Sequence, residues 1–372
     1  MKALLRNRML LTCLGTAIVT LAFAGRPSLK KVFEKDFYIG TALNLDQITG
    51  KDVASLALVE EQFNSITPEN ILKWEAVHPE PDKYNFEPAD KFVAFGEKNK
   101  MFIIGHTLLW HHQTPAWVFQ DDSGKPVDRE TLLKRLHDHI FAVAGRYKGR
   151  INGWDVVNEA VEDDGSLRKT KWLEIIGPDY VQKAFEFAHD ADPNAELYYN
   201  DFNMWKKGKV EGVVRLVGDL KSKGIRVDGI GMQGHWGMDY PPIDEADSAI
   251  QAFSALGVNV MITEMDVNVL PNPWEWRGAD ISLNFELQKK FNPYPEALPD
   301  SVQQALAQRY TEFFALFVKH SDKISRVTFW GVHDGQSWHN NWPIRGRTAY
   351  PLLFDRKLQP KPAFEAVIKA AK

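Results

Sequence analysis

The chain has 372 residues, a formal net charge of −4 and 44% hydrophobic residues. This length fits one large domain or two ordinary ones, and the apolar content is sufficient for a sizeable buried core. The slightly acidic balance, without a run of Lys and Arg, argues against nucleic acid or a membrane surface as partner.

The first 24 residues are typical of a secretory signal peptide. A basic region, an apolar run and a small-x-small cleavage site follow one another (Lys2, Arg6 and Arg8; residues 9–23; residues 22–24). An uncleaved anchor is the alternative, but the apolar run is shorter than the about 20 residues that span a membrane. We therefore expect residues 1–24 to be removed, no stable membrane insertion afterwards, and a secreted or periplasmic protein. Because Cys13 leaves with the signal, the mature chain needs no disulfide.

Eight short runs rich in β-branched and apolar residues alternate with amphipathic stretches after the signal. The runs cover residues 37–43, 64–67, 101–107, 151–157, 196–200, 229–233, 258–263 and 326–331. Between them, apolar residues recur at helical spacing, as at Leu132, Leu136 and Ile140. Eight strand–helix repeats without a linker predict an α/β fold, a (β/α)8 TIM barrel, with residues 25–372 as a single catalytic domain. In this fold the functional groups lie at the C-terminal ends of the strands.

Two of the predicted strands end in a carboxylate. Glu159 follows the fourth strand and Glu264 the seventh. Because side chains two apart share a face of a strand, we expect Glu159 to continue the face of Val157, and Glu264 that of Ile262, into the mouth of the barrel. Two acids placed in this way can cleave a glycosidic bond, one as proton donor and the other as nucleophile or base. The alternative is that each Glu is a surface residue or part of a structural ion pair.

Polar side chains gather at the ends of other predicted strands and favour a shared pocket. Asn158 precedes Glu159, and His235 follows the sixth strand, where it can hold Glu264 ionised. Lys73 and His106 end the second and third strand units. A random distribution of polar residues would not produce this pattern.

Other features carry less weight. The three histidines between residues 106 and 112 lack the spacing of a His-Glu-x-x-His metal site, and no glycine-rich nucleotide loop is present, so we expect no metal and no organic cofactor. Asp266 is expected to support a neighbouring site residue, and His139 to face solvent on its helix. The long segment 269–300, with Trp274 and Trp276, is either functional or disordered.

These motifs resemble those of glycoside hydrolase family 10, the retaining endo-β-1,4-xylanases. The resemblance runs from about residue 36 to the C-terminus, and its motifs are residues 67–74, 105–117, 154–159, 199–201, 231–235, 262–266, 328–334 and 338–355. It implies that Glu159 is the acid/base and Glu264 the nucleophile. It further implies two sets of sugar contacts: Asn158, Lys73, His106, Gln233 and His235 around the reacting sugar, and Glu69, Asn70, Trp110, Trp330 and Trp338 on the non-reducing side. Phe202 stands where the family usually has Tyr, and segment 269–300 is longer than usual, near the leaving side.

The activity implied by the resemblance is endo-hydrolysis of β-1,4-xylosidic linkages in xylan and xylo-oligosaccharides, by double displacement through a covalent glycosyl-enzyme intermediate. We expect a monomer. Glu159 must begin protonated, and we expect the negative charge of Glu264 to raise its pKa. Two alternatives remain: a retaining barrel glycosidase acting on another β-1,4-glucan or on mannan, and a carbohydrate-binding protein without catalysis.

Overall fold

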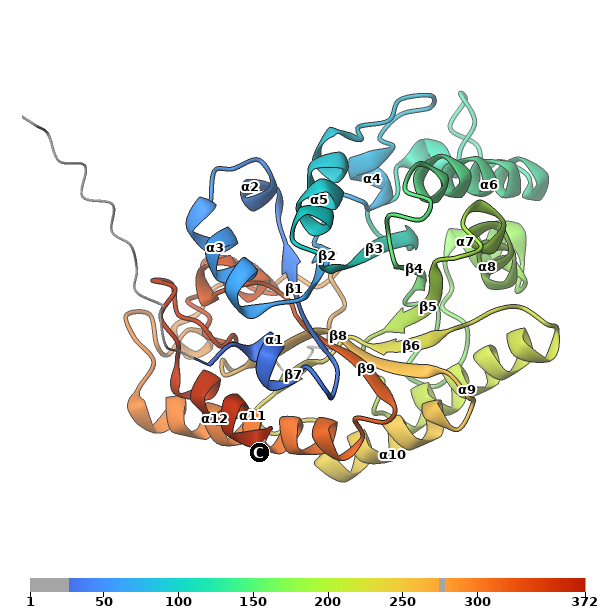
Figure 1. Cartoon of the computed structure of the whole chain (residues 1–372). Helices are drawn as coiled ribbons and strands as arrows, with labels where there is room; N and C mark the ends of the chain where they lie inside the picture. The colour runs from blue at the N-terminus through green and yellow to red at the C-terminus, as the bar shows by residue number, and fades with distance from the viewer. Residues whose placement is uncertain (1–26, 274–277, 372) are drawn as a thin grey trace, which may run out of the picture.

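The computed structural model describes residues 27–273 and 278–371, so the predicted signal peptide, Trp274 and Trp276 lie outside the described residues. Its parallel strands form a closed ring with helices outside (Figure 1). Around the ring the order is β6-β5-β4-β3-β2-β1-β9-β8, and β6 pairs with β8 to close it. The predicted (β/α)8 barrel is therefore confirmed.

The strands of the ring match the eight predicted runs in order. They are β1 (Tyr38–Leu43), β2 (Ser65–Pro68), β3 (Phe102–Leu109), β4 (Gly153–Asn158), β5 (Glu196–Asp201), β6 (Gly229–Met232), β8 (Asn259–Asn268) and β9 (Ile324–Phe329). A further short strand, β7 (His235–Gly237), extends the edge of β8 beyond the ring. It carries His235 directly beside Asp266.

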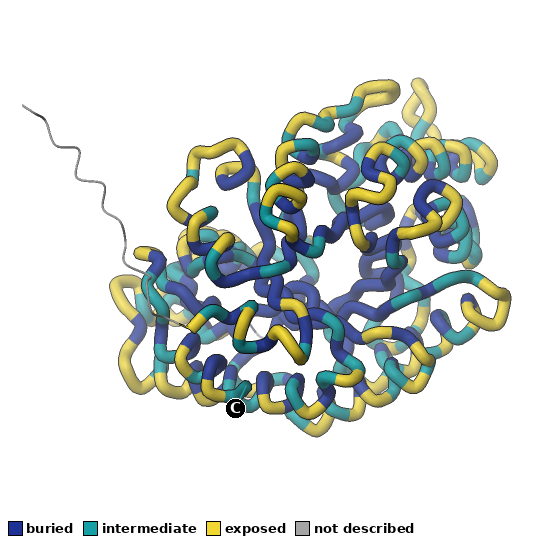
Figure 2. The backbone as a smooth tube through the Cα atoms, in the orientation of Figure 1, coloured by how far each residue is buried: buried dark blue, intermediate teal, exposed yellow. Residues whose placement is uncertain are grey.

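The helices cover the outside of the ring, with buried inner faces and exposed outer faces (Figure 2). The longer ones are α3 (Val53–Gln62), α5 (Glu87–Lys98), α6 (Arg129–Arg146), α8 (Tyr180–Ala191), α9 (Lys207–Ser222), α10 (Ile243–Ser254), α11 (Asp300–Lys319) and α12 (Pro362–Ala370). The short ones are α1 (Leu29–Val32), α2 (Leu45–Ile48), α4 (Trp74–Val77) and α7 (Lys171–Ile176). Within the described ranges, none combines the length and the apolar character needed to cross a membrane.

Apolar side chains form two separate layers. The large cluster fills the space between the strands and the helices, and it includes Val157 and Ile262. The small cluster joins Ile104, Tyr198 and Met261, which come from β3, β5 and β8. Because these strands are not neighbours in the ring, their side chains meet inside the barrel. Strand side chains in the small cluster therefore point into the barrel, and those in the large cluster point towards the helices.

One expected surface residue on α6 lies in the core. His139 is fully buried, its Nδ1 lies 3.1 Å from Nδ1 of His78, and its ring stacks on Trp74 with the centroids 3.6 Å apart. The expectation of a solvated side chain was wrong because the buried stripe of α6 is broad enough to include position 139 beside Leu136 and Ile140.

The close packing of β3 against β4 generates a stability prediction. A Cβ atom on Gly105 would lie 2.1 Å from the Trp154 ring, so Gly105→Ala forces that ring or the strand to move. We expect a loss of about 1–3 kcal/mol in the free energy of unfolding, which is typical of overpacking a core. The measurement is the shift in thermal or urea unfolding midpoint. Gly145→Ala is the matched control, because nothing lies within 4 Å of its Cβ, and its helical site should gain up to about 1 kcal/mol. Equal effects at both positions would contradict this packing argument.

Candidate active site

All of the sequence-predicted site residues line one pocket at the C-terminal ends of the strands. They are Glu69, Asn70, Lys73, His106, Trp110, Asn158, Glu159, Gln233, His235, Glu264, Trp330 and Trp338. Glu159 and Glu264 are 4% and 5% exposed. Two carboxyl groups distant in sequence are thus buried side chains of a single cavity.

Glu159 reaches the pocket through an irregularity in β4, not through strict alternation. Asp155 pairs with Tyr198, but Val157 pairs with Tyr199, so β4 contains one extra residue relative to β5. Val157 consequently packs in the outer apolar layer. Glu159 then has a φ of 60°, a backbone conformation that is strained for a side-chain-bearing residue and is found preferentially at functional sites. The expectation that Glu159 continues the face of Val157 was wrong.

Glu264 depends on a second irregularity of the same kind. Ile262 pairs with Val327 and Met265 with Phe329, so β8 has one extra residue relative to β9. Ile262 packs outward in the large cluster, whereas Thr263 and Glu264 both hydrogen-bond to the Asn200 side chain. The expectation that Glu264 shares the face of Ile262 was also wrong, because the bulge turns two consecutive side chains inward.

Side-chain amides connect the two carboxyl groups. Asn200 Nδ2 donates to Glu264 Oε1 at 2.8 Å and to Asn158 Oδ1 at 2.9 Å. Gln233 Nε2 donates to Glu159 Oε1 at 2.9 Å and to the same Asn158 oxygen at 3.3 Å. The two acids therefore share one hydrogen-bonded network that fixes their relative position.

Glu264 is held as a carboxylate by cations. His235 Nε2 lies 3.2 Å from Glu264 Oε2, and its Nδ1 lies 2.9 Å from Asp266 Oδ2. Burial lowers the pKa of His235, but Asp266 and Glu264 outweigh burial and raise that pKa to about 10. Burial likewise raises the pKa of Glu264, yet the His235 hydrogen bond and the charges of His106, His235 and Lys73 bring it below its ordinary value. Asp266 supports His235 as expected, and also accepts from Trp338 Nε1 at 2.7 Å.

Glu159 has the opposite environment. Burial raises its pKa to about 7, and the Asp201 carboxylate adds to this rise. Hydrogen bonds from Gln233 and from Trp110, whose Nε1 lies 2.8 Å from Glu159 Oε2, oppose it in part. We expected the charge of Glu264 to be the main cause of the raised pKa of Glu159, but the main cause is burial. Near neutral pH Glu264 is therefore ionised, whereas Glu159 can still hold a proton.

Polar groups that follow β2, together with His106 of β3, complete the pocket wall. Lys73 Nζ donates to Asn70 Oδ1 at 3.0 Å and lies 4.7 Å from the centroid of the Trp110 ring. His106 Nδ1 lies 2.9 Å from Asp155 Oδ2, which orients the imidazole. Burial raises the pKa of Glu69, and the Lys73 charge limits this rise. These donors and acceptors, next to aromatic rings, suit a polyhydroxylated ligand.

Several functional residues were missed by sequence reasoning. Gln113, Ala279 and Ile281 also line the pocket, and Asn200 bridges the acids. Asn200 had a usable signal, since it ends the fifth predicted strand, and Gln113 lies in a recognised motif. Ala279 and Ile281 had none, because they lie in an irregular segment without hydrophobic periodicity.

Two other observations delimit the site. In ranges 27–273 and 278–371, no group of three or more His, Cys, Asp or Glu side chains is arranged to hold a metal ion. A larger cavity of about 620 Å³ lies beside residues 295–298 and 355–362, and neither Glu159 nor Glu264 lines it. The smaller pocket therefore remains the candidate site.

The chain is similar to known xylanases over nearly its whole length. Residues 28–370 match the model of glycosyl hydrolase family 10. Endo-1,4-beta-xylanase A of Xylanibacter ruminicola is 47% identical over 359 residues, covering 96% of this chain and 97% of the relative. A solved family 10 endoxylanase from a sugarcane soil metagenome has a TM-score of 0.90 and 46% identity, covering 92% and 99% of the two chains.

A third similar protein is the intracellular xylanase of Thermoanaerobacterium saccharolyticum, solved as a mutant in complex with xylotriose. It has a TM-score of 0.80 and 36% identity, and the match covers 92% of this chain and 99% of that one. The family model spans residues 28–370, and the similar proteins are 47% and 36% identical to this chain over most of its length. The chain therefore belongs to glycosyl hydrolase family 10.

Proposed function

We propose that this chain is a retaining endo-1,4-β-xylanase, with Glu159 as acid/base and Glu264 as nucleophile. The observation that carries the proposal is the contrast between the two acids. Both are buried in one pocket, yet the pKa of Glu159 is raised to about 7 while that of Glu264 is lowered. Pairs of acids with separated pKa values are typical of a proton donor beside an ionised partner.

In the first step a Glu264 oxygen attacks the anomeric carbon, and the bond to the leaving oxygen breaks. Glu159 gives its proton to that oxygen, so the departing sugar leaves as an alcohol and Glu264 becomes a glycosyl ester. In the second step Glu159, now a carboxylate, takes a proton from water, whose oxygen attacks the same carbon and releases Glu264. The net change is hydrolysis with retention at the anomeric carbon, and no cofactor takes part.

The surrounding residues have distinct proposed roles. His235, held by Asp266, keeps Glu264 ionised for attack. Lys73, Asn70 and Glu69 offer charged and amide groups to sugar hydroxyls, while Trp330 and Trp338 offer ring faces. Xylan and xylo-oligosaccharides are the proposed substrates because the similar proteins are xylanases and one was solved with xylotriose.

We also propose that residues 1–24 direct export and that the mature protein is a monomer. The sequence pattern of the signal supports the first part. Intact-mass analysis of the protein from its host, with light scattering, should show a chain starting at Gly25 and a single-chain molar mass. Recovery of the full-length chain in the cytoplasm would contradict export. A molar mass of two chains would contradict the monomer.

The carboxylate roles predict different behaviour of two variants. Glu264→Ala should abolish turnover on every substrate, because no group remains to form the glycosyl ester. Glu159→Ala should reduce xylan hydrolysis by about 10²–10⁴-fold, the usual contribution of general acid catalysis, but spare the first step on an aryl xylobioside with a good leaving group. Steady-state and burst kinetics on both substrates measure this.

The same assays discriminate the alternatives. Equal losses for Glu159→Ala on xylan and on the aryl glycoside would contradict its role as acid. Faster hydrolysis of cellulose or mannan than of xylan by the unmodified enzyme would assign another substrate. Sugar binding without released product would indicate a binding protein.

The pKa contrast predicts the pH dependence. Glu159 must carry its proton, so kcat/KM should fall as the pH rises through about 7. Glu264 must be ionised, so kcat/KM should also fall at pH values below its ordinary pKa of about 4.5. A kcat/KM profile on xylotetraose measures both limbs.

Gln233→Ala provides the internal check on this assignment. The Gln233 hydrogen bond stabilises ionised Glu159 and lowers its pKa, so its loss should move the basic limb to higher pH. A basic limb that stays in place, or moves to lower pH, would show that another group controls it.

A further inference from the structure

A short piece of the long loop after β8 forms part of the active-site pocket. We call residues 278–282 the wall segment. Its Ala279 and Ile281 line the same cavity as Glu159 and Glu264. Ala279 is 3% exposed, although it lies in an irregular segment. The wall segment is thus positioned to contact whatever fills the pocket.

The conformation of the wall segment is fixed by local contacts. Gly278 has a φ of 75°, and a Cβ there would lie 2.7 Å from Asn203 Oδ1, so the backbone packs directly on that side chain. Asp280 Oδ1 accepts from the backbone N and the Oγ of Ser282 at 3.0 and 2.6 Å. Further along, Phe285 N donates to Pro343 O at 2.8 Å. The start of the wall segment therefore packs on the loop after β5, and the chain just beyond its end is hydrogen-bonded to the segment that follows β9.

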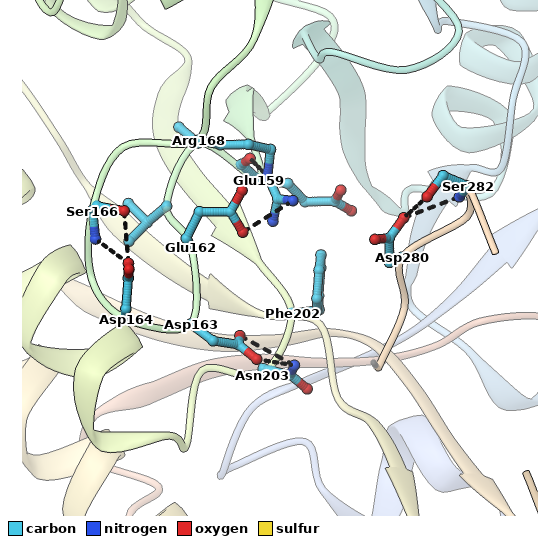
Figure 3. Close-up of polar contacts among 12 residues, drawn as sticks. Glu159, Glu162, Asp163, Asp164, Ser166, Arg168, Phe202, Asn203, Asp280 and Ser282 are labelled. Carbon is cyan, nitrogen blue, oxygen red and sulfur yellow. Dashed lines mark hydrogen bonds and ion pairs between the residues drawn. The ribbon is translucent and has the colours of Figure 1, made fainter. Parts of the chain in front are cut away.

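These contacts place the wall segment over Glu159. Gly278 packs on Asn203, which follows β5, and the charge of Asp280 acts on His112, which follows β3. Strands β3 and β5 flank β4, the strand that precedes Glu159. Glu159, Phe202 and Asp280 come from three different loops and surround a common space in Figure 3.

The leaving sugar must enter this space. The acid donates its proton to the leaving oxygen, so the departing sugar lies beside the carboxyl group of Glu159. Ala279 and Ile281 line the same pocket as Glu159. A departing sugar beside Glu159 therefore lies within reach of the wall segment.

Phe202 does not offer an open ring face here. It is 5% exposed, and its ring centroid lies 4.6 Å from Lys209 Nζ and 5.5 Å from Arg168 Cζ. Lys209 in turn forms a fully buried ion pair with Asp201 at 2.9 Å. Phe202 covers this pair and does not line the pocket, whereas Ala279 and Ile281 do. Of these two apolar side chains Ile281 is the larger and the more exposed.

We propose that the wall segment forms the leaving-side subsite, and that Ile281 is a specificity-determining residue that contacts the departing xylose. This inference rests on the proposed function. The contact acts only when the leaving group is a sugar, and it thereby helps to select which linkage of an oligosaccharide is cut.

The test compares Ile281→Ala on two substrates. Xylotetraose places sugars on both sides of the cut bond, whereas xylobiosyl fluoride has a leaving group of a single atom. We expect kcat/KM on xylotetraose to fall about tenfold, the contribution of a small apolar group in a pocket, and kcat/KM on the fluoride to stay within about twofold. Cleavage positions in xylopentaose, read by ¹⁸O labelling from water, should shift.

Two variants serve as controls. Ile281→Val keeps a branched apolar side chain and should retain most of the xylotetraose activity. Leu287→Ala makes a comparable truncation on the same loop at a side chain that is 47% exposed and outside the pocket, and should change neither substrate.

Each other outcome overturns the inference. Equal losses on both substrates would indicate a structural role for Ile281, no loss would indicate no contact, and a gain on xylotetraose would indicate that Ile281 obstructs the sugar. An unmodified enzyme that cleaves the fluoride but no xylo-oligosaccharide would contradict the proposed function itself.

Discussion

The hydrogen-bonded path from Glu264 through Asn200 and Asn158 towards Glu159 is the interaction on which the active site depends. It joins side chains from β4, β5 and β8 and from Glu159, which follows β4; β4 and β5 are neighbours in the ring, whereas β6 lies between β5 and β8. Because amide groups have both donors and acceptors, the path carries no net charge and leaves the ionisation of each acid to its other neighbours. The barrel thus sets the distance between the acids separately from their protonation.

Those other neighbours make two chemically identical side chains behave differently. Glu264 faces His235, His106 and Lys73, which favour its ionised form, whereas burial and Asp201 favour the protonated form of Glu159. Asp266 contributes indirectly, since it keeps His235 charged. An arrangement of this kind is expensive to bury and is therefore characteristic of a site that uses it for catalysis.

Both acids reach the pocket because the backbone near them departs from regular strand geometry. A regular strand would direct Val157 and Glu159 to the same face, and likewise Ile262 and Glu264. In β8, one extra residue between Ile262 and Met265 breaks this rule. After β4, the φ of 60° at Glu159 breaks it. In both places an apolar side chain faces the helices while the following acid faces the pocket. The wall segment is a further irregular part of the chain that lines the pocket, and it adds side-chain contacts that the strand ends do not provide.

The amino-acid sequence by itself determined the order of eight strands, the barrel and the two acids with several polar neighbours at its mouth, because buried strands and polar strand ends leave a local pattern. Only the resemblance to the family implied the roles of Glu69, Asn70, Trp110, Gln233, Trp330 and Trp338. The sequence could not determine the inward turn of Glu159, which depends on a left-handed backbone conformation, or that of Glu264, which depends on the register of β8 with β9. The burial that raises the pKa of Glu159, the burial of His139 and the position of Ile281 are likewise set by chain segments distant in sequence. Only the tertiary structure brings those segments together.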